Sequence, residues 1–212
     1  MPQQGVELQE PFAKPAQQRL ADILGTYVFL TTEIMLFGGF FVLAMFLRIA
    51  YPEEYVRSSK ALHLFIGGAN TAVLLTSSLL VALAVQAARS GARRWAAWCL
   101  AGASLLGIVF LCLKAFEYSL EYSEGMLPVP ASEAQFSSPV QHLFMNLYLL
   151  ATGLHALHVT AGVVLLAGMG YGIARRALRV PTRSVVVEAG GLYWHVVDVI
   201  WVFLYPVLYL AR

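Results

Sequence analysis

Charged side chains are scarce in this chain: Asp, Glu, Lys and Arg make up 12% of its 212 residues, whereas hydrophobic residues make up 59%. A soluble domain carries about 25% charged residues, so a polar exterior on every side is excluded. The mean hydropathy of +0.69 indicates a membrane protein. The net charge is only +2, and no basic stripe is present, so we expect no nucleic-acid partner.

Cysteine is nearly absent, and the motifs of soluble enzymes are missing. The two cysteines are Cys99 and Cys112. On one helix they would lie about 20 Å apart, which is too far for a disulfide between them. The sequence has no GxSxG, P-loop, CxxC or HExxH motif. We therefore predict no catalytic residue and no metal-binding residue in this chain.

Five apolar runs are each long enough to cross a bilayer, which takes about 20 helical residues. They predict an all-α, polytopic membrane protein with a bundle of five transmembrane helices. Residues 1–20 are polar and contain three prolines, so we expect a cytoplasmic tail followed by a transmembrane domain over 21–212. The predicted helices cover approximately 24–48, 64–88, 95–118, 142–173 and 185–210.

Basic residues are distributed unequally between the two sets of connections. Nine precede the first run or lie between the second and third, or the fourth and fifth, runs. The long connection at about 121–141 belongs to the other side and has no Lys or Arg. The positive-inside rule then predicts a cytoplasmic N-terminus and a C-terminus outside.

Ionisable side chains inside apolar runs are costly in lipid, so they usually face a protein interior and mark polar networks or functional sites. For Glu33 we favour a structural hydrogen bond over a proton-linked or lipid-linked role, and for Asn70 a hydrogen bond between helices. The candidate set is Glu33, Asn70, Lys114, Glu117, His155, His158, Glu188, His195 and Asp198.

Helical spacing pairs some of these residues. Lys114 and Glu117 are three residues apart and share a face, which predicts an ion pair near the membrane interface, with a proton relay as the less favoured alternative.

The last run carries two stripes. Glu188 and His195 differ by about 20° on a helical wheel, and Asp198 lies about 60° from His195. This polar stripe should face the bundle as a buried network, with a proton or lipid-headgroup site as the alternative. Trp194 and Trp201, seven residues apart, form an aromatic stripe suited to packing.

His155 and His158 lie one turn apart and could contribute to a metal site, but no third ligand accompanies them. We therefore favour two buried, hydrogen-bonded histidines. A b-type haem would need a matching pair of histidines on a facing helix, and His195 has no such companion. A stand-alone membrane b-type cytochrome is thus the least favoured hypothesis.

Four segments on successive predicted helices resemble motifs of subunit III of haem–copper terminal oxidases, in its five-helix bacterial form. They are TEIMLFGGFF around Glu33, NTAVLLTSS from Asn70, TGLHALHVTAG around His155, and EAGGLYWHVVDVIW from Glu188 to Trp201. The resemblance covers residues 22–212. One departure is Lys114, which stands where the family often has glutamine.

The resemblance implies an accessory, non-catalytic subunit of a respiratory oxygen reductase in the bacterial inner membrane. Such a chain packs against subunit I, in a complex with subunit II and other subunits, holds structural phospholipids and supports proton uptake. Haem and copper would reside in the partner subunit, with no cofactor bound by this chain. A subunit-III-like protein of a nitric oxide reductase or a quinol oxidase is the alternative, and the electron donor stays open.

Overall fold

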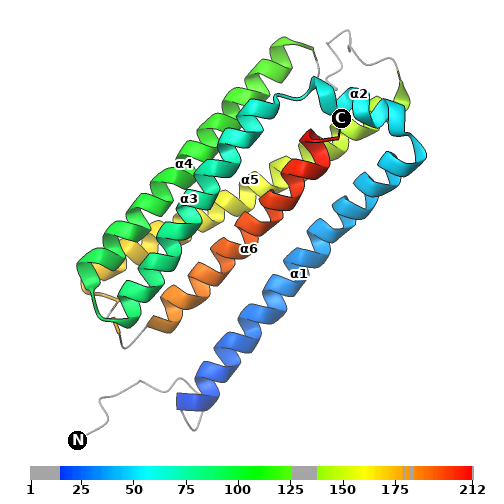
Figure 1. The fold of residues 1–212 in the computed structure, drawn as a ribbon. Helices are drawn as coiled ribbons and strands as arrows, with labels where there is room; N and C mark the ends of the chain where they lie inside the picture. The colour runs from blue at the N-terminus through cyan, green and yellow to red at the C-terminus, as the bar shows by residue number, and fades with distance from the viewer. Residues whose placement is uncertain (1–14, 126–137, 179, 182–183, 212) are drawn as a thin grey trace, which may run out of the picture.

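The computed structural model describes residues 15–125, 138–178, 180–181 and 184–211 of the chain (Figure 1). These residues form six α-helices and no strand. The helices are α1 (Pro15–Ala50), α2 (Pro52–Ala61), α3 (Leu64–Arg89), α4 (Arg93–Ser123), α5 (Pro139–Ala174) and α6 (Ser184–Tyr209). Five of them, all except α2, are long and apolar enough to cross a membrane. The predicted fold class and number of spans are therefore confirmed.

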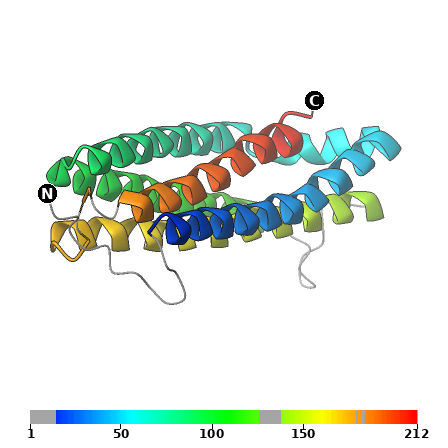
Figure 2. The same cartoon turned by 90° about the horizontal axis from the view of Figure 1, so that it is seen from below.

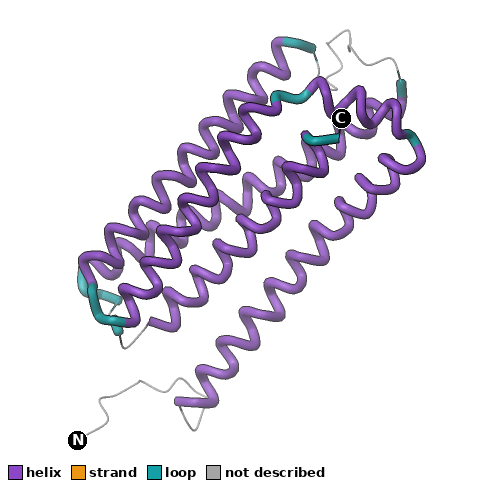
Figure 3. The backbone as a smooth tube through the Cα atoms, viewed as in Figure 1, coloured by secondary structure: helices purple, strands orange, loops and turns teal. Residues whose placement is uncertain are grey.

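The long helices run side by side, with the described turns at the two ends of the bundle (Figure 3). Helix α3 packs against α4 and α6, and α5 packs against α4 and α6. Helix α1 lies at the edge, beside α6 and α5 (Figures 1 and 2). The connections from α3 to α4 and from α5 to α6 lie at the same end as the start of α1. The basic loops of the sequence therefore gather at one end of the bundle.

The short helix α2 was not predicted, because its sequence is polar and lies outside the five apolar runs. Its start is favoured by Pro52 at the first helical position and by acidic residues in the first turn. The Tyr55 hydroxyl donates to the carbonyl of Val207 at 2.8 Å, and the Ser59 hydroxyl donates to that of Leu208 at 2.7 Å. Helix α2 thus satisfies two of the carbonyls that the last turn of α6 leaves without a partner.

Several helices extend beyond the apolar runs that predicted them. Helix α1 begins at Pro15, inside the segment assigned to the tail, and α4 continues to Ser123 instead of ending near residue 118. Helix α5 starts at Pro139, where the Ser138 side chain accepts a hydrogen bond from the Val140 amide. Hydropathy locates only the lipid-facing part of a helix, so polar terminal turns escape it.

Glycines allow three helices to meet around one tryptophan. A Cβ added to Gly107 of α4 would lie 2.8 Å from Cη2 of Trp194, and one added to Gly162 of α5 would lie 2.7 Å from its Cε3. The indole of α6 therefore occupies the space that these two side chains would need. Small residues at such contacts let membrane helices approach closely.

Candidate functional site

A carboxyl and an imidazole meet where α1 packs on α5. His158 Nε2 lies 2.7 Å from Glu33 Oε2. His158 Nδ1 lies 2.8 Å from the carbonyl oxygen of Leu154, which can only accept, so Nδ1 carries a hydrogen. The short contact at Nε2 then requires one proton between the two groups, held by either imidazole or carboxyl. The arrangement can therefore exchange a proton internally.

Aromatic rings surround this pair without sealing it. The Tyr193 hydroxyl donates to the His158 carbonyl at 3.1 Å, and the Tyr193 ring stacks with Phe29 at 6.1 Å. Phe37 meets the His158 ring edge-on at 5.4 Å. The side chains of His158 and Glu33 remain 16% and 15% exposed. The pair is therefore accessible from the surface of the described chain.

His155 has different surroundings from His158. Its ring is fully buried and stacks on Trp201 at 5.2 Å, with the edges of Phe37 and Phe110 at 6.3 and 5.6 Å. Neither ring nitrogen has a hydrogen-bond partner among the described residues. Within those residues, no three His, Cys, Asp or Glu side chains are grouped so that they could hold a metal ion. His195, the other histidine considered for haem, lies at Ser78 of α3.

A second polar cluster lies inside the bundle around Lys114. Its ammonium donates to Glu117 Oε2 at 2.9 Å, to the Tyr148 hydroxyl at 3.1 Å and to the Tyr209 hydroxyl at 3.0 Å. An ammonium has three N–H donors, so all of them are used. The Lys114 and Glu117 side chains are 3% and 0% exposed. The predicted ion pair therefore exists, and both of its side chains are buried.

The pair is buried because α4 continues past it and side chains of neighbouring helices cover it. Helix α4 ends at Ser123, more than two turns beyond Lys114. Tyr148 donates to Glu121 Oε1 at 2.6 Å, and Tyr209 donates to Glu117 Oε1 at 2.8 Å. Helices α4, α5 and α6 are thereby connected through one hydrogen-bonded network, in which Glu121 Oε2 alone has no described partner.

The polar stripe of α6 faces α3, toward the interior as the spacing suggests. Glu188 Oε1 accepts from Arg89 Nε at 2.9 Å. His195 Nδ1 lies 2.6 Å from Ser78 Oγ. Asp198 is buried, and its Oδ1 has no hydrogen-bond partner among the described residues. Thus Glu188 pairs with Arg89 and His195 with Ser78, so the stripe does not form one connected network among the described residues.

Asn70 departs from expectation. The residue is fully buried, but neither atom of its amide has a hydrogen-bond partner among the described residues. Its neighbour Thr71 accepts from Trp201 Nε1 at 3.1 Å, and Ser77 donates to the Ala103 carbonyl at 3.0 Å. The hydrogen bonds between helices therefore come from hydroxyls of the same motif, not from the amide.

Sequence reasoning missed three members of the Lys114 cluster. Glu121 lies seven residues after Lys114, two turns along one face, and that spacing could have identified it. Tyr148 lies seven residues before His155, so it shares a helix face with a residue that the sequence had already singled out. Tyr209 has no such signal, because it lies at the far end of another helix.

The chain is similar in sequence to a known family of proteins. Residues 14–211 match the family described as cytochrome c oxidase subunit III. The chain belongs to this family. A relative in Thermostichus vulcanus, named cytochrome c oxidase subunit 3, is 30% identical over 192 residues, which cover 89% of this chain and 86% of the relative.

Two further relatives show the breadth of the family. A probable cytochrome c oxidase subunit 3 of Mycobacterium tuberculosis is 30% identical, over 89% of this chain and 87% of its own. A probable quinol oxidase subunit 3 of Staphylococcus epidermidis is 28% identical, over 88% and 87%. The predicted family is confirmed, and with it the accessory subunit role in a haem–copper oxidase.

Proposed function

We propose that this chain packs directly against subunit I of the oxidase, holds structural phospholipids and supports proton uptake by the catalytic subunit. The observation that carries the proposal is the pair of Glu33 and His158, because it places an exchangeable proton at an accessible contact between two helices. A carboxyl and an imidazole in hydrogen-bond contact form a common proton-transfer pair. Glu33 would therefore be proton-linked, rather than purely structural as we expected.

The proposed lipid role is supported by the exposed surface of α1. Met35, Val42 and Ile49 of this helix are 74%, 72% and 76% exposed. Exposing such apolar side chains to water would be unfavourable, whereas acyl chains or an apolar partner helix would cover them. We assign these surroundings to structural phospholipid and to subunit I together.

The redox centres would belong to the partner. In this proposal haem and copper lie in subunit I, subunit II and others complete the complex, and the present chain supplies packing, lipid contacts and a proton-exchanging pair. The complex would lie in the bacterial inner membrane. The basic end of the bundle, with the N-terminus, would face the cytoplasm, in keeping with the positive-inside rule.

The electron donor of the complex is either cytochrome c or a quinol. We favour cytochrome c, the donor in the names of two of the relatives above. The relative named as a quinol oxidase subunit is the specific observation that favours a quinol instead. Purification from native membranes in mild detergent, followed by a reduced-minus-oxidised spectrum and oxygen uptake with each donor, separates the two.

Recovery of the chain together with a large haem–copper subunit supports the proposed partnership. Recovery of the chain alone, or with unrelated proteins and no haem signal, would overturn it.

A substitution tests the proton role. Glu33→Gln keeps the size of the side chain and its hydrogen-bonding capacity but removes the titratable proton. We expect the purified complex to assemble with normal haem content and to complete several-fold fewer turnovers before it inactivates. Glu53→Gln, on the exposed surface of α2, is the matched control and should behave as wild type. Equal lifetimes for all three proteins would refute the proton role.

A further inference from the structure

A stripe of ionisable residues follows one face of α4 toward the end of the bundle at which α2 lies (Figure 1). It consists of Lys114, Glu117, Glu121 and, just after the helix, Glu124. The first three residues are buried, whereas the Glu124 side chain is 46% exposed. Glu124 Oε2 lies 3.5 Å from Nε2 of His63, the residue that precedes α3. The stripe therefore joins the buried cluster around Lys114 to the surface of the described chain.

The hydrogen bonds of this cluster occupy every donor but leave one acceptor over. All three N–H donors of Lys114 are used. The hydroxyl of Tyr148 donates to Glu121 Oε1 at 2.6 Å, and that of Tyr209 donates to Glu117 Oε1 at 2.8 Å. Glu121 Oε2 is buried and has no hydrogen-bond partner among the described residues. Glu121 is therefore the member of the cluster that can take up a further proton.

The charges of the cluster lead to the same residue. With both carboxyl groups ionised, one buried cation would face two buried anions. Lys114 balances Glu117, so Glu121 would be an unbalanced anion. Residues 125–138, which follow in the sequence, contain no Lys or Arg that could balance it. Burying an unpaired carboxylate is strongly unfavourable, and such a group is stabilised by taking up a proton.

The hydrogen-bonded network accommodates a protonated Glu121 without any change in its distances. The hydroxyl oxygens of Tyr148 and Tyr209 lie 3.1 Å apart, and either of them can donate to the other. When Glu121 carries the proton, its O–H donates to Tyr148, and Tyr148 turns its own hydrogen toward Tyr209. Each hydroxyl oxygen then accepts two hydrogen bonds, which is within its capacity. One rotating hydroxyl thus separates the ionised state from the neutral state.

From this geometry we propose that Glu121 binds one exchangeable proton, which reaches it from the aqueous phase at the α2 end of the bundle by way of Glu124 and His63. The inference goes beyond the proposed function, because the pair of Glu33 and His158 shares no residue with this stripe. The titratable and charged groups around the site are Lys114, Glu117, Tyr118 and Glu124 of α4 and its end, Tyr148 of α5, Tyr209 of α6, and His63 before α3.

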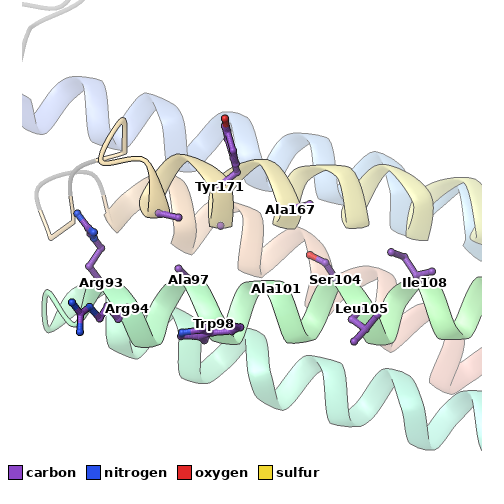
Figure 4. Close-up of a pocket in the computed structure, with 12 residues that line it drawn as sticks. Arg93, Arg94, Ala97, Trp98, Ala101, Ser104, Leu105, Ile108, Ala167 and Tyr171 are labelled. Atoms are coloured by element: carbon purple, nitrogen blue, oxygen red, sulfur yellow. The ribbon is translucent and has the colours of Figure 1, made fainter.

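The cavity between α4 and α5 does not provide a shorter route. The α4 residues that line it run from Arg93 to Ile108, toward the start of the helix (Figure 4). From Ile108 to Glu121 is thirteen residues, or about 20 Å of helix. Glu124, in contrast, lies within one turn of Glu121 and is partly exposed. A proton therefore has the shortest path over Glu124.

Infrared spectroscopy of the purified full chain in detergent micelles at neutral pH tests the proposal. The signal is the carbonyl stretch of a protonated carboxyl group, identified by its shift in deuterated water. Glu121→Gln removes the site. Glu117→Gln leaves Glu121 as the counter-ion of Lys114, so Glu121 should then ionise. Glu53→Gln, at an exposed position on α2 at the same end of the bundle, is the matched control.

We expect wild type and Glu53→Gln to show equal bands, and Glu121→Gln to lose the intensity of one carboxyl group. Glu117→Gln should lose the same intensity although Glu121 is still present. If wild type and Glu121→Gln have equal bands, Glu121 is ionised or holds a metal cation, and the proposal is overturned. A band of wild-type size in Glu117→Gln would overturn the argument from charge balance. The comparison with Glu121→Gln decides the presence of the proton by itself.

The rate of exchange tests the route. After transfer into deuterated water, the band of Glu121 should shift several-fold more slowly in Glu124→Gln than in wild type, because the carboxylate that passes the proton on is gone. Glu53→Gln should exchange at the wild-type rate. Equal rates in Glu124→Gln and wild type would overturn the route over Glu124.

Discussion

Removing the ammonium of Lys114 should be among the most damaging single changes to this fold. Lys114→Met keeps the apolar stem but leaves Glu117 as a buried carboxylate without its cation. Three hydrogen bonds disappear, one to a charged group and two to the hydroxyls of Tyr148 and Tyr209. With about 1.5–3 kcal/mol for the first and about 1 kcal/mol for each of the others, the loss is about 4 kcal/mol. Breaking a buried ion pair at one partner costs a similar 3–5 kcal/mol.

The assay is reversible unfolding of the chain in mixed micelles, followed by tryptophan fluorescence. We expect the free energy of unfolding to fall by about 4 kcal/mol for Lys114→Met. Lys60→Met, the same change at an exposed position on α2, should stay within about 0.5 kcal/mol of wild type.

A double-mutant cycle tests the pair itself. Glu117→Gln leaves the acceptor for Tyr209 in place but removes the negative charge. Lys114→Met/Glu117→Gln should therefore be more stable than the sum of the two single effects predicts, by about 2–3 kcal/mol. If the two effects add within about 0.5 kcal/mol, or if Lys114→Met alone costs less than about 1 kcal/mol, the account of a buried, coupled network is wrong.

Two further predictions concern packing and pH. Gly162→Ala should lower the free energy of unfolding by about 1–3 kcal/mol, since the new methyl group would meet Trp194 at 2.7 Å. Gly153→Ala on the same helix has nothing within 4 Å and should be neutral or slightly stabilising by the same unfolding assay. Burial raises the pKa of Tyr55 to about 12, with Arg48 opposing the shift. A phenol in the unfolded chain has a pKa of about 10, so this contribution is complete below pH 10 and is lost as the pH rises from 10 to 12, by about 3 kcal/mol. Unfolding titrations should show that wild type loses about 3 kcal/mol more stability than Tyr55→Phe between pH 10 and 12; an equal loss in both would contradict the assignment.

The long helices were predictable because their lipid-facing segments must be apolar over a fixed length. The span that begins near residue 24 is found at Ile23–Ala50, and the other four also match their apolar runs. The sequence did not reveal the elements that depend on polar contacts. Helix α2 carries its stability in two hydrogen bonds to the end of α6, made by Tyr55 and Ser59 across about 150 residues of sequence. Local spacing does not reveal a contact of that kind.

The sequence identified the residues of the candidate sites but not which of them would contact one another. Glu33 lies inside an apolar run, so it needs a hydrogen-bonding partner, and the same holds for His158. Their pairing across 125 residues follows from how α1 lies against α5, which no local pattern specifies. Conversely, the two histidines one turn apart suggested a shared role, but one joins the pair and the other is enclosed by aromatic rings.

Lys114 shows why a departure from a family motif can be more informative than a match. Where the family often has glutamine, this chain places a group with three donors and a full positive charge. Such a group is tolerable inside a membrane protein only if its donors are satisfied and its charge is balanced. The structure meets both requirements, with two tyrosine hydroxyls and Glu117 as acceptors. Those acceptors come from α4, α5 and α6, so the lysine couples the positions of three helices. A glutamine, with two donors and no charge, would leave Glu117 unbalanced in this chain.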